Sequence, residues 1–174
     1  MNIARKIVTV LVAVMIGVFI QSSLLGAFLP KMLVPNFVLI VGVFLAFFES
    51  TVFGAFLAFL AGLTFDLYSG ILLGPWAGSL AVVFGMLTLL SRRMFVDSPF
   101  TAFASVFISA LAGNIVYLLL LTRFSPLGGD VFSLALIVNS FMTALVAPPC
   151  FSLLRRVYVR RSHSLSGRFA AAYL

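Results

Sequence analysis

Charged side chains are scarce in this chain of 174 residues, because Asp, Glu, Lys and Arg together make up only 9% of it. A soluble domain normally carries about a quarter charged residues. A chain with so few charges cannot cover a globule with a surface that water wets, which argues against an ordinary soluble fold. Hydrophobic residues make up 63% of the sequence, so lipid is the solvent that the composition predicts.

Cysteine and histidine each occur once, as Cys150 and His163. A single cysteine excludes an intramolecular disulfide, and we expect it to pack as a small apolar side chain. His163 lies in a polar tail without acids or cysteines at the spacing of metal ligands, so no metal site is expected. The sequence also lacks a Ser/His/Asp set, a carboxylate pair and a phosphate-binding loop. These absences predict a protein that is not an enzyme and holds no cofactor.

Long apolar runs fill most of the sequence. A membrane-spanning helix needs about 20 apolar residues, with a range of about 17–25, and helices satisfy their own backbone hydrogen bonds in lipid. The sequence therefore predicts a single all-α integral membrane domain over residues 1–174, with about six transmembrane helices. The expected spans are residues 7–29, 35–48, 51–66, 72–90, 100–121 and 131–154, followed by a basic tail over residues 155–174.

The second and third spans are short, and they could instead form one long bent helix. The distribution of Lys and Arg favours two helices. With six spans and the N-terminus inside, only Lys31 and Arg123 fall on the outer side, whereas a single bent helix would move Arg92 and Arg93 outside. Both termini are therefore expected in the cytoplasm of a bacterium. The basic residues on the inner side are Arg5, Lys6, Arg92, Arg93, Arg155, Arg156, Arg160, Arg161 and Arg168.

The formal net charge of +7 predicts acidic partners. Because the basic residues fall in separate inner patches, we expect anionic lipid headgroups there rather than nucleic acid. A cytoplasmic protein that binds residues 155–161 is the alternative. The residues expected to make the lipid or cytoplasmic contact are Arg92, Arg93, Arg155, Arg156, Arg160 and Arg161.

One helical face of the third span carries small residues. Gly54, Ala58, Gly62 and Asp66 recur every four residues and so share that face. Small residues at this spacing let a second helix approach closely. We therefore expect a packing seam, made either with another helix of this chain or with a partner.

Asp66 ends this apolar run and is the acid closest to the membrane interior. We expect it to hold Ser69, the backbone N–H groups of the Ser69–Gly70 turn, or an Arg of a partner. A proton or ion relay is an alternative, although a relay normally needs a second titratable group in the membrane. The other carboxylates fall in predicted loops, where an acid can cap a turn, and are Glu49, Asp97 and Asp130.

Two amides, Asn114 and Asn139, lie in the middle of the fifth and sixth spans. An amide in lipid needs a hydrogen-bond partner, so hydrogen bonds between helices are the expected role. A ligand pocket lined by both side chains is the alternative.

Two stretches of the sequence carry a resemblance. The second span opens with Pro35-Asn36-Phe37-Val38-Leu39-Ile40, and residues 54–74 have the sequence GAFLAFLAGLTFDLYSGILLG. A basic pair, Arg92 and Arg93, follows the next helix. This order of a Pro-polar-apolar opening, a Gly-rich helix, an Asp-x-x-Ser-Gly segment and a basic pair resembles the MreD family of rod shape-determining proteins.

The resemblance implies a non-enzymatic scaffold of the bacterial cell-elongation machinery in the inner membrane. Such a protein would bind the bitopic protein MreC. Through MreC, it would connect MreB filaments to a RodA-type glycan polymerase and a class B penicillin-binding protein in peptidoglycan synthesis. The residues that the scaffold would use for partner binding or helix packing are Pro35, Asn36, Gly54, Ala58, Gly62, Asp66, Gly70, Gly74, Asn114 and Asn139.

The resemblance also implies a fold shared with the substrate-binding subunits of vitamin uptake transporters. The alternative function is therefore a small-molecule-binding membrane subunit of a vitamin or metabolite transporter. That function predicts a pocket on the outer half of the protein, near Asp66, Tyr68, Asn114 or Asn139.

Overall fold

The computed structural model describes residues 3–30, 33–49, 51–69, 73–91, 99–124 and 134–158, and all the regular elements in these ranges are helical. This confirms the expected all-helical architecture. The first helical stretch comprises α1 (Ile3–Phe19), a π-helical turn η1 (Ile20–Leu25) and the short α2 (Gly26–Phe28). The helices that follow are α3 (Phe37–Phe48), α4 (Val52–Ser69), α5 (Pro75–Ser91), α6 (Pro99–Phe124) and α7 (Leu134–Tyr158).

Four helical stretches among the described residues are long and apolar enough to cross a membrane. They are Lys6–Phe28, Val52–Ser69, Phe100–Arg123 and Leu134–Val157. Two further apolar helices, Phe37–Phe48 and Pro75–Leu89, are shorter. The structure is therefore consistent with a helical membrane protein in which two of the helices are short.

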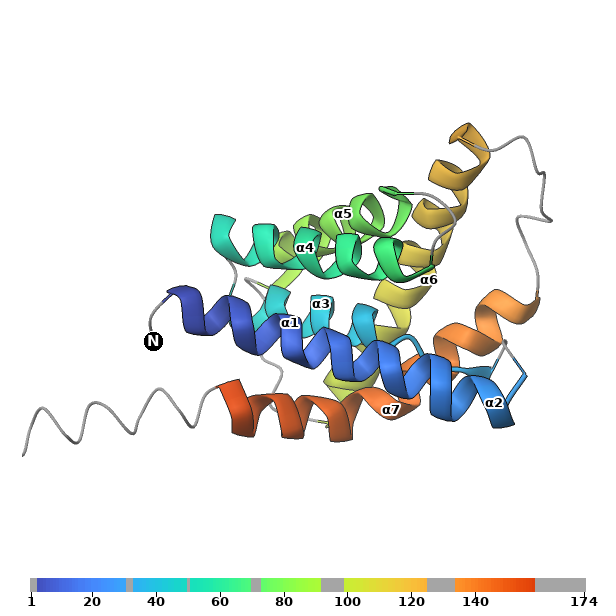
Figure 1. Cartoon of the computed structure of the whole chain (residues 1–174), viewed down its shortest axis with the longest axis horizontal. Helices are drawn as coiled ribbons and strands as arrows, with labels where there is room; N and C mark the ends of the chain where they lie inside the picture. The colour runs from blue at the N-terminus through green and yellow to red at the C-terminus, as the bar shows by residue number, and fades with distance from the viewer. Residues whose placement is uncertain are drawn as a thin grey trace, which may run out of the picture.

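The helices run back and forth along one axis. In Figure 1, α1 and α4 run from left to right and α5 and α7 return, while α6 is inclined to the rest. The start of α1 and the end of α7 therefore lie at the same end of the bundle, which we call the terminal end. The most extensive contacts join α6 with α7, α4 with α5, and α5 with α6.

The short helix α3 forms the centre of the bundle. It contacts α1, α4, α5, α6 and α7, and residues 38–46 are all buried. Its sequence is apolar on every side, as expected for a helix enclosed by protein. With 12 residues it is about 18 Å long, shorter than the hydrocarbon core of about 30 Å. In a bilayer, the chain that leads into α3 must therefore obtain its hydrogen bonds from the protein.

Several helix boundaries differ from the prediction, and α7 continues to Tyr158, into the predicted basic tail. Two of the differences bear on the residues discussed below. α3 begins after Asn36 and not at Pro35, because Asn36 is the N-cap and its side chain accepts a hydrogen bond from the backbone N–H of Leu39. α4 continues to Ser69, so Asp66 lies inside its last turns and does not end the helix. No Gly or Pro stands between these two positions to stop the helix earlier.

An ion pair ties the first helix to the end of α3. Lys6 Nζ donates to both carboxylate oxygens of Glu49, at 2.6 and 2.8 Å. The same nitrogen lies 5.9 Å from the centroid of the Phe53 ring at the start of α4. Glu49 therefore pairs with a cation in addition to capping α3, which its place in a predicted loop did not indicate.

Candidate functional site

Asp66 is buried against the start of α5, where its carboxylate accepts three backbone hydrogen bonds. Asp66 is only 1% exposed. Oδ2 accepts from the N–H groups of Gly74 and Ala77, each at 3.0 Å, and Oδ1 accepts from the N–H of Trp76 at 3.1 Å. The first N–H groups of a helix have no partner within it, and a negative charge there is favourable for the helix dipole. Asp66 is therefore the cap of α5.

The expected partners of Asp66 are partly corrected by this geometry. The Ser69 hydroxyl donates to the backbone carbonyl of Asp66 at 3.0 Å, and not to its carboxylate. The described N–H groups that the carboxylate holds belong to Gly74, just before α5, and to Trp76 and Ala77 in its first turn. A carboxylate can accept several hydrogen bonds at once, so the Asp66 side chain alone can hold the end of α4 to the start of α5.

Gly74 provides the backbone conformation that the Asp66 cap needs. Its φ angle is 116°, a region that residues with a side chain rarely adopt. An ideal Cβ at this position would meet nothing within 4 Å. The requirement for glycine is therefore conformational and does not come from lack of space.

The small-residue seam of α4 packs directly on α5. A Cβ on Gly62 would lie 2.6 Å from the Cα of Ala77 and 2.7 Å from the carbonyl oxygen of Trp76. A partner helix therefore cannot dock on this face, because α5 of the same chain already occupies it. The seam residues are all buried, and they are Gly54, Ala58, Gly62 and Asp66.

Aromatic rings surround the Asp66 cap. The Trp76 ring stacks on the Tyr117 ring with centroids 4.4 Å apart, and it meets the edge of the Phe65 ring at 5.2 Å. These rings join α4, α5 and α6. Neither Trp76 nor Tyr117 was predicted as a site residue, because helical periodicity does not show that α5 and α6 pack side by side at these positions.

A second polar cluster holds the buried segment that leads into α3. The backbone N–H of Asn36 donates to the Thr143 hydroxyl at 3.0 Å, and the Asn139 amide donates to the carbonyl of Val34 at 2.8 Å. Val34, Pro35 and Asn36 are all buried. α7 therefore supplies hydrogen bonds to this buried backbone, which in a bilayer could not obtain them from lipid.

The π-helical turn η1 directs polar side chains from the first helical stretch toward its neighbours. Gln21 Oε1 accepts a hydrogen bond from the backbone N–H of Phe37 at 3.3 Å. The Tyr68 hydroxyl donates to the Ser22 hydroxyl at 2.8 Å. Such turns insert an extra residue into a helix and thereby re-aim its side chains. Here η1 links the first stretch to both α3 and α4.

Asn114 and Ser79 make the polar contacts of α6. The Asn114 amide donates to the Ser140 hydroxyl of α7 at 3.2 Å, and the Ser79 hydroxyl of α5 donates to the carbonyl of Gly113 at 2.7 Å. Asn114 and Asn139 thus each hold a neighbouring element, and each bonds a different partner. Ser79 is a buried contact that the sequence analysis missed.

The polar groups of the described residues are used within the protein. Every buried side-chain nitrogen or oxygen in these ranges has a hydrogen-bond partner. No three His, Cys, Asp or Glu side chains of the described ranges are grouped so that they could hold a metal ion. The buried polar residues characterised above therefore contribute to holding the helices together.

One exposed side of α5 carries a glycine on which no described residue packs. Gly85 is exposed, and an ideal Cβ there meets no described atom within 4 Å. Val82 and Leu89 flank it and are 52% and 74% exposed. Glycine costs about 1 kcal/mol relative to Ala in a helix interior. The contacts of the described chain give no reason for that cost.

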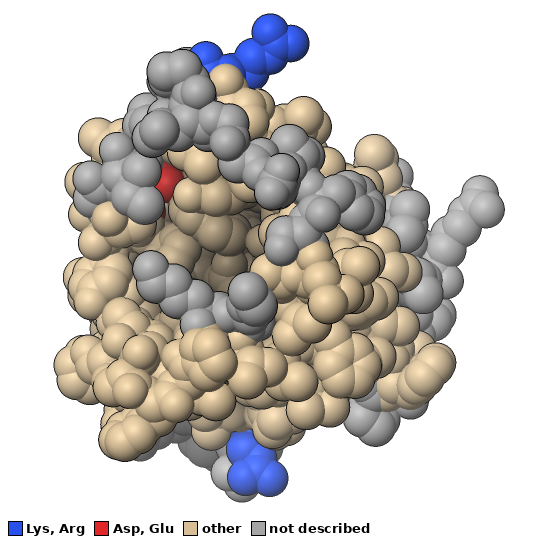
Figure 2. Space-filling model, turned by 90° about the vertical axis from the view of Figure 1, so that its right-hand side faces the viewer, with Lys and Arg blue, Asp and Glu red and all other residues tan. Residues whose placement is uncertain are grey.

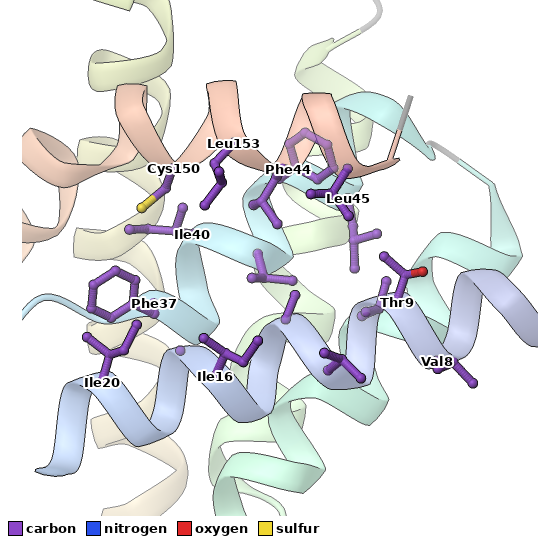
Figure 3. Close-up of a pocket in the computed structure, with 17 residues that line it drawn as sticks. Val8, Thr9, Ile16, Ile20, Phe37, Ile40, Phe44, Leu45, Cys150 and Leu153 are labelled. Carbon is purple, nitrogen blue, oxygen red and sulfur yellow. The ribbon is translucent and has the colours of Figure 1, made fainter. Parts of the chain in front are cut away.

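An apolar groove of about 420 Å³ lies between α1 and α7, with α3 as its floor. Figure 3 shows Cys150 and Leu153 of α7 across α3 from Ile16 of α1 and Ile20 at the start of η1. The lining side chains are apolar except for the Thr9 hydroxyl and the Cys150 thiol. The groove is closest to the terminal end of the bundle, since its α7 wall is formed by residues 150–157.

The opposite end of the bundle is hollowed near its centre, as Figure 2 shows. Few charged side chains of the described residues appear on this face, and the blue ones lie at its edges. A hollow at this end is where the transporter-subunit alternative would place its pocket.

Arg155 and Arg156 are exposed in the last turns of α7. The predicted residues that lie outside the described part of the chain are Lys31, Gly70, Arg92, Arg93, Asp97, Asp130, Arg160, Arg161, His163 and Arg168. Comparison of the chain with known protein families, with curated proteins and with solved structures finds no match.

Proposed function

We propose that this protein is a non-enzymatic scaffold of the bacterial cell-elongation machinery that docks partner proteins in the inner membrane. The resemblance of residues 35–93 to the MreD family supports the biological role. The apolar helices support the membrane location. In this proposal six helices enter the bilayer, the terminal end of the bundle faces the cytoplasm, and Arg155 and Arg156 lie at the inner surface.

The exposed Gly85 face of α5 is the observation that supports docking best. The α4 seam is filled by α5, so a partner needs a different small-residue surface. In lipid, helices associate where small residues let their backbones approach. Gly85 has open space around it, between the exposed side chains of Val82 and Leu89. A single membrane-spanning helix fits this face, such as that of the bitopic MreC implied by the resemblance.

The other partners follow from this contact. MreC would carry the link from the scaffold to MreB filaments, the RodA-type polymerase and the class B penicillin-binding protein. The scaffold itself then needs no reaction centre, and its task is to hold the partner helix at a fixed position in the membrane.

Capture of the partner by a Gly85→Leu variant tests the proposal. We expect at least a tenfold loss of co-purified MreC with little change in melting temperature, because a Cβ at this position meets no described atom within 4 Å. Leu145→Phe on α7 is the matched control, since Leu145 is exposed as well, at 55%. Normal capture by a stable Gly85→Leu protein would overturn the docking assignment.

Depletion of the protein in its rod-shaped host tests the biological role. Rounding of the cells over several generations, not rescued by nutrients, is the expected result. An unchanged cell shape would overturn the role in elongation.

The hollow at the opposite end of the bundle favours the alternative, a small-molecule-binding transporter subunit. That function predicts a growth defect cured by one vitamin or metabolite, and a rise in melting temperature when the purified protein meets that compound. Neither effect is expected of the scaffold.

A further inference from the structure

The length of the groove between α1 and α7 is close to the thickness of one membrane leaflet. On α1 its wall, residues 8–20, is about 18 Å long at 1.5 Å per residue, and on α7 its wall, residues 150–157, is about 11 Å long. Half of the hydrocarbon core is about 15 Å thick. A partner helix that crosses the whole bilayer would extend well beyond the α7 wall. An acyl chain from one leaflet fits the length of the groove.

The chemistry of the walls also fits a hydrocarbon chain. Val12, Ile16 and Leu153 are among the lining residues and are 51%, 54% and 64% exposed. These branched side chains alternate with the smaller Ala13 and Gly17 on α1, which makes the wall irregular. A flexible chain can fill the irregular space between such side chains.

Positive charge flanks the part of α7 that lines the groove. Arg155 and Arg156 are exposed, and helical spacing puts them to either side of the face that carries the lining residues Leu153, Leu154 and Val157, with Arg156 next to Leu153. Lys6 of α1 is already paired with Glu49, and neither arginine has an ion-pair partner among the described residues. Guanidinium groups bind phosphate through paired hydrogen bonds. With the terminal end at the cytoplasm, these arginines lie at the level of the inner-leaflet headgroups.

We infer that the groove binds an anionic phospholipid of the cytoplasmic leaflet. One acyl chain lies on α3 between α1 and α7, and the phosphate-bearing headgroup meets Arg155 and Arg156. The bound lipid fills the gap between two helices that otherwise meet mainly through α3. This site is separate from the Gly85 face, so its failure would leave partner docking untouched.

Native mass spectrometry of the full-length protein in detergent tests the headgroup contact. The protein is titrated with phosphatidylglycerol and, separately, with phosphatidylethanolamine. We expect tighter binding of phosphatidylglycerol, and roughly a fivefold loss for each arginine replaced by Gln. Arg123→Gln is the matched control, because Arg123 is exposed at the other end of the bundle. Equal binding of the two lipids, or an unchanged Arg155→Gln/Arg156→Gln variant, would overturn the inference.

A photoreactive acyl chain tests the position of the lipid. Phosphatidylglycerol that carries a diazirine in its chain should attach to residues 8–20 and 150–157. Leu153→Trp should reduce this labelling severalfold, while Leu145→Trp, also at an exposed α7 position but outside the groove, should not. Labelling spread evenly over the exposed helices would contradict the site. Cross-links from the groove to a second copy or to a partner helix would identify a protein as its occupant instead.

Discussion

The carboxylate of Asp66 accepts a hydrogen bond from the N–H of Ala77 at 3.0 Å, across the connection between α4 and α5. The same Ala77 has its Cα 2.6 Å from the place where a Cβ on Gly62 would lie. One residue of α5 is therefore held by a carboxylate and by a backbone contact, both from one face of α4.

Asp66→Ala should destabilise the protein more than Asp66→Asn. Alanine leaves three backbone donors without an acceptor, and each unsatisfied buried group costs about 1–3 kcal/mol. Asparagine keeps one acceptor oxygen and loses the charge. Thermal unfolding of the purified variants in detergent measures the difference. An Asp66→Ala protein as stable as the unsubstituted chain would show that the cap does not stabilise α5.

Two glycines of similar sequence context should respond oppositely to alanine. Gly62→Ala forces the backbones of α4 and α5 apart, and overpacking of this kind costs typically about 1–3 kcal/mol. Gly85→Ala meets open space and should be neutral or stabilising by up to about 1 kcal/mol. Melting temperatures of both variants provide the test. A Gly62→Ala protein that melts no lower than Gly85→Ala would contradict the close packing.

The Lys6–Glu49 pair should contribute measurably to stability. The two side chains are 24% and 15% exposed, so solvent screens the pair less than a surface ion pair. Lys6→Met and Glu49→Gln should each destabilise the protein. Their double-mutant cycle should give a coupling of about 1 kcal/mol, within the range seen for residues in contact. Additive effects of the two substitutions would mean that the pair does not hold α1 to the end of α3.

Thr143→Val should loosen the start of α3. Valine matches threonine in shape but leaves the N–H of Asn36 without its acceptor, at a cost of about 1–3 kcal/mol. We expect a lower melting temperature and faster amide hydrogen exchange over residues 34–37. Thr122→Val in α6 is the control, because Thr122 is exposed and its hydroxyl bonds only to a carbonyl of its own helix among the described contacts. Equal exchange in both variants would argue against the α7 contact.

Apolar runs and their interruptions were enough to predict the helices, because a run of this length has few alternatives in lipid. Periodicity also predicted that Gly54, Ala58, Gly62 and Asp66 share a face. It did not predict what covers that face, since α5 or a partner would leave the same sequence pattern. The structure decides for α5 through the contact of Gly62 with Ala77.

Other contacts needed the three-dimensional arrangement. Lys6 and Glu49 are 43 positions apart. That they lie at the same end of the bundle can be inferred only once the first two spans are known to pack together. Asp66 was expected to hold N–H groups near the Ser69–Gly70 turn, and the described N–H contacts of its carboxylate come from further along the chain, at Gly74 and the first turn of α5. The partner of Gly85 is still a prediction, because an exposed glycine in a sequence is indistinguishable from a buried one.

The enclosed α3 has a consequence for the way this protein enters a membrane. A segment of 12 apolar residues is too short to be recognised and released into lipid as a separate span. Its 12 residues are followed closely by α4, which is long enough, so the two helices are expected to leave the insertion machinery together as a hairpin. The segment before α3 obtains hydrogen bonds from the Thr143 and Asn139 side chains of α7, which are synthesised after α3. We therefore expect α7 to close over α3 only after α3 has been inserted.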